Sequence, residues 1–288
     1  MPTLRDIRRK INSIKSTQTI TRTMKMVASS RLRRSQDELE KIRPYALKMN
    51  ELKNRLVASV PENIHPLLKE KEEVKNVLIF ACASDKGLCG SFNMNVIMAV
   101  ENFIFQNREK YEKIGLYILG KKIKDYFSRR GALIVKEWVE LRRMEKEVIS
   151  RITEDLILLC TSGEFDKVFA IYTFYRSPVK QIVTFEELIP IKAEDQEKKV
   201  DYLYEPNVSY VIEKFLPEHI RTRVSYIIFN SQTSEHASRM NAMENATNNC
   251  GEMINSLTLI YNKKRQESIT KEMLDIVGGA EAVKTTSY

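Results

Sequence analysis

The first 57 residues follow a seven-residue repeat of apolar side chains and contain no glycine. Eleven of the sixteen repeat positions are apolar, which is typical of a coiled-coil seam. The positions are Leu4, Ile7, Ile11, Ile14, Gln18, Thr21, Lys25, Ala28, Leu32, Ser35, Leu39, Ile42, Ala46, Met49, Lys53 and Leu56. One helix over this segment would be about 80 Å long. Such a helix needs a long partner, and Pro44 is expected to kink it.

The seam is interrupted at three consecutive repeat positions, which are Gln18, Thr21 and Lys25. Around them, Ile20, Met24 and Val27 are apolar on a neighbouring phase of the helix. This pattern predicts that the apolar face shifts to those three residues over this stretch.

A second long helix is predicted from Asn207 to Val277, before Gly278 and Gly279, with Pro217 kinking or separating its first turns. At about 1.5 Å per residue it would span about 105 Å. Its apolar seam contains Met243, Ala246, Cys250, Met253, Leu257 and Ile260, and continues on a shifted phase with Ile269, Met273 and Ile276. Each stripe is too narrow for a globular core, so antiparallel pairing of the two end helices is expected.

Between the end helices, strand patterns alternate with helix patterns. Strands are predicted at Asn76–Ala83, Leu116–Leu119, Leu133–Val135, Lys167–Tyr175 and Gln181–Ile189, and helices at Met94–Lys113, Lys121–Arg130 and Glu145–Ser162. The fold class is therefore α/β plus a long antiparallel coiled coil, with a mainly parallel sheet in a Rossmann-like domain. The expected boundaries are 1–57 for the first helix, 58–74 for a linker, 75–190 for the α/β domain, 191–206 for a connector and 207–288 for the second helix.

The formal charge of +9 is concentrated in the first helix, where residues 1–57 carry 15 Lys and Arg against 5 Asp and Glu. The remaining residues are close to neutral, which indicates a localised acidic partner. A nucleic-acid-binding adaptor is one alternative. Residues 1–44 contain no aromatic side chain that could stack on bases, which leaves only duplex or phosphate contact by charge.

Cysteine and histidine are too few and too scattered for a metal site or a disulfide framework. The four cysteines contain no CxxC pair, and the three histidines form no HExxH motif. No apolar run approaches the length of a membrane span, and the N-terminus carries no signal core. We therefore expect free thiols, no metal or cofactor, no membrane insertion and a cytosolic product.

The segment Ser84–Gly90 follows a buried strand and opens a helix, the place where α/β folds often bind phosphate. It matches neither GxxxxGK[ST] nor GxGxxG, so a structural or partner-contacting turn is favoured over a nucleotide-binding enzyme. Cys89 is next to a helix start, and a buried inert thiol is favoured over a nucleophile.

Four segments together resemble the gamma subunit of F-type ATP synthases, over essentially the whole chain. They are LRDIRRKINSIKSTQTITRTMKMVASSRLRRSQ from Leu4, SDKGLCGSFN from Ser84, DYLYEP from Asp201, and EHASRMNAMENATNNCGEMINSLTLIYNKKRQESITKEMLDIVGGAEAV from Glu235. The resemblance implies a central rotor shaft that performs no bond chemistry. Its asymmetric coiled coil would turn inside a hexamer of alpha and beta subunits and couple proton or sodium flow through a membrane ring to ATP synthesis, or to hydrolysis in reverse.

The resemblance also implies partners and a location. The partners are the alpha and beta subunits, the epsilon subunit and the membrane c-subunit ring, with no nucleic acid. The implied location is the cytoplasmic face of a bacterial inner membrane, as a peripheral protein. The chloroplast type carries a regulatory cysteine pair before the C-terminal helix. No cysteine lies between residues 161 and 249 here, so thiol regulation is not expected.

Individual site residues follow from the same resemblance. Beta-subunit contacts are implied for Met24, Lys25, Lys86, Gly87, Leu88, Cys89, Gly90, Arg239, Arg265, Gln266, Thr270 and Glu272. Contacts with the membrane ring or epsilon, at the foot of the shaft, are implied for Arg31, Arg33, Arg34, Tyr202, Tyr204 and Glu205. Neutralising Arg33 and Arg34 is accordingly expected to weaken coupling to the membrane part and to spare hydrolysis by the soluble part. The extreme C-terminus, to which Lys284–Tyr288 add five residues, would sit in an apolar bearing.

Overall fold

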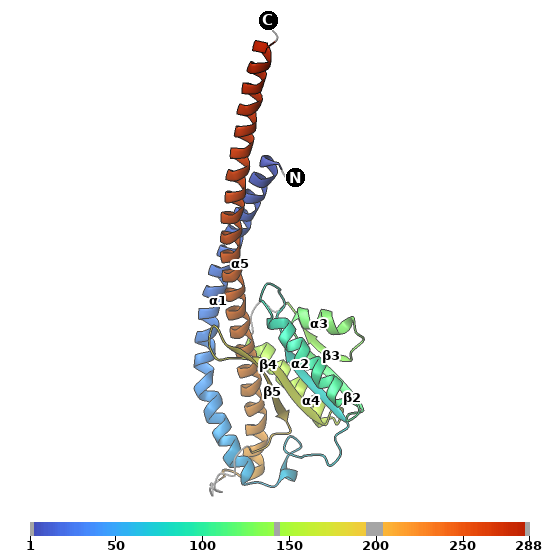
Figure 1. Cartoon of the computed structure of the whole chain (residues 1–288). Coiled ribbons are helices and arrows are strands. Elements are labelled where there is room, and N and C mark those ends of the chain that lie inside the picture. Colours follow the sequence, from blue (N-terminus) through green and yellow to red (C-terminus); the bar gives the residue numbers. More distant parts are fainter. Residues whose placement is uncertain (1–2, 141–144, 194–203, 286–288) are drawn as a thin grey trace. The chain divides into compact units, whose positions relative to one another are not determined.

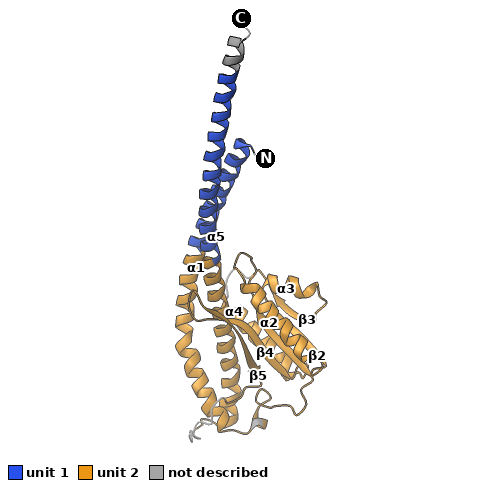
Figure 2. Cartoon of the chain, in the orientation of Figure 1, with its two compact units in different colours: residues 1–27, 242–288 blue, residues 28–241 orange. Residues whose placement is uncertain are grey.

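The computed structural model describes residues 3–140, 145–193 and 204–285, and it divides into two compact units (Figures 1 and 2). Unit 1 comprises Met1–Val27 and Ala242–Tyr288, and unit 2 comprises Ala28–Asn241. The first and last helices each contribute to both units. These helices are α1 (Leu4–Ala58) and α5 (Val208–Thr285).

Unit 2 contains a five-stranded sheet in the order β3-β2-β1-β4-β5. In chain order its elements are β1 (Asn76–Cys82), α2 (Phe92–Asn107), β2 (Lys113–Leu119), α3 (Lys121–Ser128), β3 (Ile134–Trp138), α4 (Lys146–Thr161), β4 (Lys167–Tyr175) and β5 (Gln181–Ile189), and a short 3-10 turn, η1 (Glu62–Ile64), precedes them. All neighbouring strands are parallel except β4 and β5. The predicted fold class is therefore confirmed.

Apolar side chains on the two faces of the sheet pack against different helices. On one face, α2 and α3 pack through residues such as Val96 and Phe127. On the other face, α4 and the first part of α5 pack through residues such as Leu156 and Ile220, together with Leu56 at the end of α1. Strand β1 is buried along both faces, as its continuous apolar sequence predicts.

The heptad positions of α1 form its buried stripe in both units. In unit 1, Ile7, Ile11 and Thr21 are buried, and in unit 2, Leu32 and Leu39 are buried. Leu32 and Leu39 form a cluster with Ala237 of α5, where a small residue allows the two helices to approach closely. The paired long helices are thus built on the predicted α1 seam.

The predicted shift of the apolar face near residue 20 is wrong. Ile20 is 59% exposed and Val27 is 48% exposed, whereas the polar residue Thr21 is only 9% exposed. The seam keeps its heptad phase through the polar positions, because hydrogen bonds to α5, described below, satisfy their side chains.

The α5 seam in unit 1 also differs from the prediction. Met243 is buried, but Met253 and Ile260 are about half exposed, as is Ile269. Leu257 is among the more covered positions, as predicted, but so are Ile254 and Tyr261, which continue a seven-residue spacing from Thr247. At Met253, Ile260 and Ile269, the prediction chose apolar residues on a neighbouring, more exposed phase of the helix.

The ends of several elements differ from prediction. Helix α2 ends at Asn107, because Lys113 already pairs with Asn76 in the parallel ladder of β1 and β2. Helix α5 continues past Gly278 and Gly279 to Thr285, since a helical glycine costs only about 1 kcal/mol. Both long helices run through their prolines, Pro44 and Pro217, so the start of α5 is not a separate helix.

Candidate functional site

The loop Ser84–Gly90 leaves the carboxyl end of β1 and returns into α2 with two residues in the left-handed region. Leu88 has φ of +62° and Gly90 has φ of +59°. Such a φ is costly for leucine, which has a Cβ atom. The Leu88 side chain is nevertheless 61% exposed, so the loop holds an apolar group outward.

Hydrogen bonds close the loop from within. The amide oxygen of Asn93, in the first turn of α2, accepts from the Ser84 backbone N at 2.9 Å and lies 2.9 Å from Ser84 Oγ. Asn93 Nδ2 donates to Cys89 Sγ at 3.1 Å. The Cys89 side chain is only 1% exposed, as the inert-thiol interpretation predicts.

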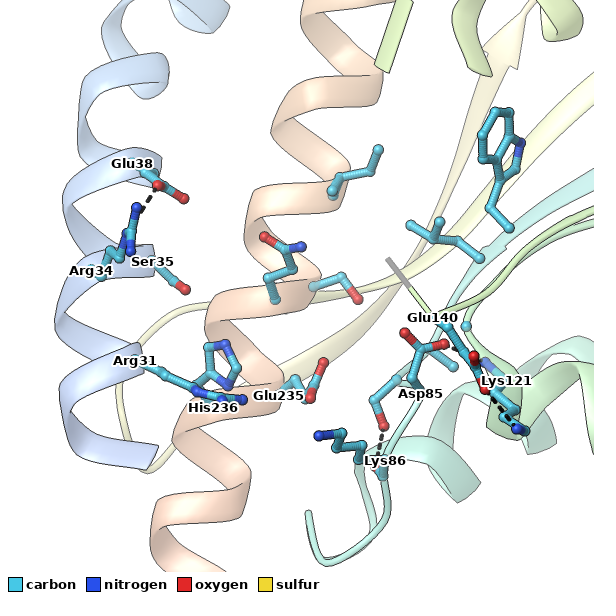
Figure 3. Close-up of a pocket in the computed structure, with 18 of the residues that line it drawn as sticks. Arg31, Arg34, Ser35, Glu38, Asp85, Lys86, Lys121, Glu140, Glu235 and His236 are labelled. Atoms are coloured by element: carbon cyan, nitrogen blue, oxygen red, sulfur yellow. Dashed lines mark hydrogen bonds and ion pairs between the residues drawn. The ribbon is translucent and has the colours of Figure 1, made fainter. Parts of the chain in front are cut away.

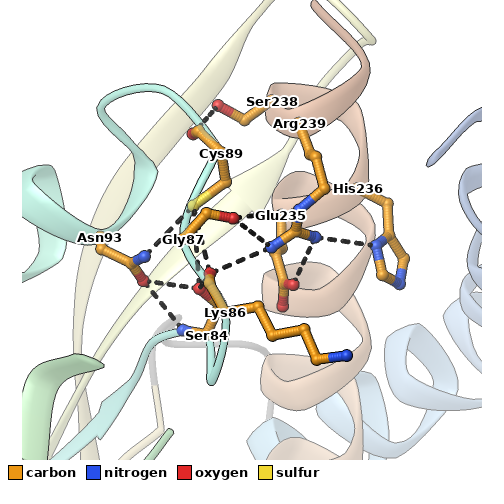
Figure 4. A network of polar contacts seen from close by, with 9 residues as sticks. All are labelled: Ser84, Lys86, Gly87, Cys89, Asn93, Glu235, His236, Ser238 and Arg239. Atoms are coloured by element: carbon orange, nitrogen blue, oxygen red, sulfur yellow. Dashed lines mark hydrogen bonds and ion pairs between the residues drawn. The ribbon is translucent and has the colours of Figure 1, made fainter. Parts of the chain in front are cut away.

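Helix α5 holds the same loop from the other side (Figure 4). Arg239 Nη2 donates to the carbonyl oxygen of Lys86 at 3.1 Å and to that of Gly87 at 3.3 Å. One turn earlier on the helix, Glu235 accepts from Arg239 Nη1 at 2.6 Å. Ser238 Oγ donates to the carbonyl oxygen of Cys89 at 2.7 Å. The loop therefore rests on one face of α5.

A cleft of about 890 Å³ lies beside this loop in unit 2 (Figure 3). Residues of α1, of the β1–α2 loop, of the β2–α3 turn and of α5 line it, together with Trp138, which is the single tryptophan of the chain. Trp138 Nε1 donates to Tyr117 Oη at 2.7 Å, and that hydroxyl donates to Asp155 at 2.7 Å.

Charges of both signs line the cleft, and several of them form ion pairs. The pairs are Lys121 with Glu140 at 2.8 Å, Arg34 with Glu38 at 3.7 Å and, at its edge, Arg239 with Glu235 at 2.6 Å. This arrangement gives the cleft walls no strong excess of either sign.

Burial shifts the pKa values of two neighbouring groups on α5. It raises the pKa of Glu235, and the nearby positive charge of Arg239 opposes this shift. For His236, burial lowers the pKa to about 4, and the positive charges of Arg239 and Arg31 add to the effect. His236 is therefore neutral near pH 7.

The strand-end crevice where doubly wound folds bind nucleotides is filled by α5 in this chain. The strand order changes direction between β1 and β4, which is the position such ligands occupy. There, Ser231 Oγ donates to the carbonyl oxygen of Cys82 at 3.3 Å, and Ser234 Oγ donates to that of Thr173 at 3.1 Å. This geometry argues against the nucleotide-binding alternative.

In unit 1, the polar positions of the α1 seam pair with α5. Lys25 Nζ lies 2.6 Å from Glu244 Oε1. Thr247 Oγ1 donates to Thr21 Oγ1 at 2.8 Å, and Gln18 Nε2 donates to the Thr247 carbonyl oxygen at 3.3 Å. About two helical turns of the α1 seam, from Gln18 to Lys25, are thus held by polar contacts.

The residues toward the C-terminal end of α5 in unit 1 are exposed. This set comprises Arg265, Gln266, Thr270 and Glu272, and Glu272 accepts from Ser268 at 3.3 Å. At 3.6 residues per turn, the four lie on the same side of the helix as the exposed apolar residues Ile269, Met273, Ile276 and Val277. This side of α5 is open in the chain by itself.

The structure separates residues that the sequence analysis placed together at the foot. Arg31 and Arg34 line the cleft beside Lys86, and Arg33 is exposed on the same stretch of α1. Tyr204 instead packs against the core cluster that contains Ile212, near the start of α5. From Arg34 to Leu56, near the end of α1, the helix rises by about 33 Å. Glu205 is exposed next to Tyr204, and Tyr202 lies outside the described residues.

In the described part of the chain, no helix is both long enough and apolar enough to cross a bilayer. The same residues contain no group of three or more His, Cys, Asp and Glu side chains arranged to hold a metal ion. All four cysteines are free thiols.

Comparison with known proteins assigns the family. The ATP synthase family model matches residues 3–283. The ATP synthase gamma chain of Syntrophobacter fumaroxidans is 41% identical over 291 residues, covering 99% of this chain and all of the relative. The chain belongs to the ATP synthase gamma chain family. The gamma chain of Chlorobium limicola is 38% identical and covers the same shares of the two sequences.

Solved structures agree with this assignment. A chain in the central stalk and c-ring structure of the Tetrahymena thermophila mitochondrial ATP synthase is 28% identical, with a TM-score of 0.62, covering 79% of this chain and 99% of that one. A chain in the Euglena gracilis mitochondrial ATP synthase is 21% identical with a TM-score of 0.72, covering 97% and 94%, and shows the same fold. The resemblance to gamma chains and the predicted role as the central-stalk rotor subunit of an ATP synthase are therefore confirmed.

Several residues that shape this gamma chain were not singled out in the sequence analysis. Glu235 lies four positions before Arg239, a spacing that brings side chains together on a helix, and this signal was available. Glu244 gave no such signal, because its partner Lys25 lies on another helix.

The ion pair between Lys25 and Glu244 is expected to contribute little to the stability of unit 1. Both side chains are more than one-third exposed, and pairs of this kind contribute below about 1 kcal/mol. A double-mutant cycle with Lys25→Gln and Glu244→Gln, measured by thermal unfolding, should give a coupling energy in that range. A coupling of about 3 kcal/mol would contradict this expectation.

Proposed function

We propose that this gamma chain is a non-catalytic rotor shaft that turns inside a hexamer of alpha and beta subunits. The observation that carries the proposal is the surface of unit 1. Its seam is closed by apolar packing and by polar pairs, yet large apolar side chains such as Ile20, Met26, Leu259 and Met273 stay at least half exposed on the outside. A helix pair with this surface suits an apolar sleeve formed by other subunits.

The proposed partners are the alpha, beta and epsilon subunits and the membrane ring of c subunits. Beta contacts are proposed for Met24, Lys25 and the exposed α5 residues Arg265, Gln266, Thr270 and Glu272. A beta contact is also proposed for the Lys86–Gly90 loop. Two groups of the loop could make this contact. Leu88 is an exposed apolar side chain, and Lys86 carries a charged ammonium group. Tyr202, Tyr204 and Glu205 stay proposed contacts of the ring or of epsilon.

Coupling of ring rotation to ATP synthesis needs no catalytic group on this chain. The rotor would press on catalytic beta subunits in turn, and proton or sodium flow through the ring would drive it. We place the assembled protein on the cytoplasmic face of a bacterial inner membrane, as a peripheral subunit.

Single-molecule rotation tests this proposal. The chain is assembled with alpha and beta subunits, a bead is attached to the exposed side of α4, and the hexamer is fixed to glass. ATP should drive stepwise rotation in one direction, and the isolated chain should not hydrolyse ATP. ATP hydrolysis by the assembled hexamer without any turning of the bead would overturn the proposal.

The position of the arginines changes the expected effect of neutralising them. Because Arg34 lines the cleft beside the Lys86–Gly90 loop, we place Arg33 and Arg34 at the catalytic hexamer and not at the foot. Arg33→Gln/Arg34→Gln should lower ATP hydrolysis by the soluble assembly about fivefold, equivalent to about 1 kcal/mol.

The matched variant is Glu205→Gln, which also removes an exposed charge but at the start of α5. It should leave soluble hydrolysis unchanged and weaken ion-driven synthesis in membranes. If hydrolysis were lost only for Glu205→Gln, Glu205 would lie at the catalytic hexamer and the two arginines at the foot, which is the opposite of the proposed placement.

A further inference from the structure

We propose that Arg239 acts within the chain as the positioning residue of the Ser84–Gly90 loop, fixing the loop to α5 so that the two move as one body. The contacts between Arg239 and the loop form within this chain and need no other subunit. Its consequence rests on the proposed rotor function, because a loop that contacts beta transmits force only if it is fixed to the turning helix. The resemblance implied a direct beta contact for Arg239, whereas here the side chain lies beneath the loop.

The guanidinium group of Arg239 has little capacity left for an external partner. Its side chain is only 11% exposed. Nη1 donates to Glu235 at 2.6 Å, Nη2 donates to the carbonyl oxygens of Lys86 and Gly87, and Nε lies 3.4 Å from the Gly87 oxygen. Figure 4 shows this planar group between the loop and the helix. A fixed fork of donors suits two adjacent carbonyl groups, and a lysine could not reach all of these acceptors at once.

The loop requires such an anchor because its own packing is weak at the tip. Leu88 holds a strained positive φ while its side chain points away from the core. Carbonyl groups at positions 86, 87 and 89 point toward α5 and accept from Arg239 and Ser238. Without Arg239, the Gly87 carbonyl loses its donor and the Lys86 carbonyl keeps only donors from within the loop, such as Ser84 Oγ at 2.7 Å. Among the described residues, the Ser238 hydrogen bond would then be the remaining polar contact between these carbonyls and the helix.

Glu235 completes the arrangement by orienting Arg239. Its side chain is 17% exposed, and it faces Arg239 on α5, Asp85 on the loop and Arg31 on α1. The Glu235 carboxyl oxygen accepts from one edge of the guanidinium at 2.6 Å, so that the other edge is directed at the loop.

Pulsed labelling of thiols tests the proposal on the full chain alone, without partners. Iodoacetamide modifies accessible cysteines, and mass spectrometry of peptides reads each cysteine separately. Cys89 lies under the loop and is 1% exposed, whereas Cys82 lies in β1 and is fully buried in the core. Cys89 therefore reports opening of the loop, and Cys82 reports unfolding of the domain in the same molecule.

Arg239→Gln should accelerate labelling of Cys89 about tenfold or more, because hydrogen bonds to a charged donor are lost. Cys82 should label at the wild-type rate. Arg239→Lys should fall between Arg239→Gln and wild type. The matched control is Arg151→Gln, which removes an exposed arginine from α4 and should change neither rate.

Two results would overturn the proposal. Unchanged labelling of Cys89 in Arg239→Gln would mean that the loop is held without Arg239. Equal acceleration at Cys89 and Cys82 would mean that Arg239 stabilises the whole domain and not the loop. Neither result depends on assembly with other subunits, so failure of the rotor proposal and failure of this inference are separate outcomes.

Discussion

Gly120→Ala should lower the free energy of unfolding of unit 2 by about 3 kcal/mol or more. Gly120 has φ of +109°, a region that residues with a side chain rarely adopt. A Cβ atom there would lie 2.4 Å from the carbonyl oxygen of Ala83 and 2.7 Å from its carbonyl carbon. Both atoms belong to the backbone at the end of β1, so the contact cannot be relieved by rotating a side chain.

Gly120 lies close to Ala83 where β2 and β1 end, and these strand ends form one wall of the cleft. Gly120 N donates to the carbonyl oxygen of Trp138 at 2.8 Å, and Ala83 N donates to that of Leu119 at 2.8 Å. Alanine would have to move these bonds apart, and the cleft would change shape as stability falls.

Gly131→Ala is the matched control for this prediction. Gly131 also has a positive φ, of +67°, but a Cβ there would meet nothing within 4 Å. The expected cost is about 1 kcal/mol, from backbone strain alone. Urea unfolding followed by near-ultraviolet circular dichroism measures both variants, and equal losses would show that the contact with Ala83 is not the cause.

Arg223→Met should destabilise unit 2 by about 3 kcal/mol, because it leaves a half-buried carboxylate without its cation. Arg223 on α5 donates through Nε to Glu186 on β5 at 2.7 Å and through Nη2 to the second carboxylate oxygen. Tyr172 Oη donates to the same carboxylate at 3.2 Å, and burial raises the pKa of this tyrosine. The cluster ties the shaft helix to the sheet.

Two companion variants separate this effect from the loss of a charge. Arg221→Met, two positions earlier, removes a cation that pairs with Glu218 in a more exposed position, and should cost below about 1 kcal/mol. Arg223→Met/Glu186→Gln removes both charges and should recover part of the lost stability. Thermal unfolding measures all three. A similar cost for Arg221→Met and Arg223→Met would contradict the assignment.

The sequence predicted the fold well where one physical rule dominated. A seven-residue repeat without glycine determines a paired helix, and continuous apolar strands alternating with helices determine a mainly parallel sheet. The prediction failed near Ile20 and Val27, because it assumed that apolar residues always take the seam. Hydrogen bonds from Thr247 and Gln18 made the polar phase the buried one, and such bonds join residues more than 200 positions apart.

The loop of the candidate site was predictable from the sequence, but the α5 residues that hold the loop were not. Gly87 and Gly90 beside a buried strand indicated a special turn. That Arg239 lies beneath this turn depends on α5 covering the carboxyl ends of β1 and β4, a tertiary arrangement that local spacing does not encode. The spacing of the foot residues was not predictable for a related reason. Arg34 and Tyr204 were grouped by family resemblance, whereas distance along α1 keeps them apart.

Trp138 gives the cleft an optical property of its own. The indole is the only one in the chain, it lines the cleft, and its N–H is engaged by the hydroxyl of Tyr117. Indole emission from the whole 33.5 kDa chain therefore originates at one wall of one cleft. Changes in the polarity or hydration of that wall shift the wavelength and intensity of the tryptophan emission. This rotor subunit therefore carries an intrinsic fluorophore beside the loop that Arg239 holds.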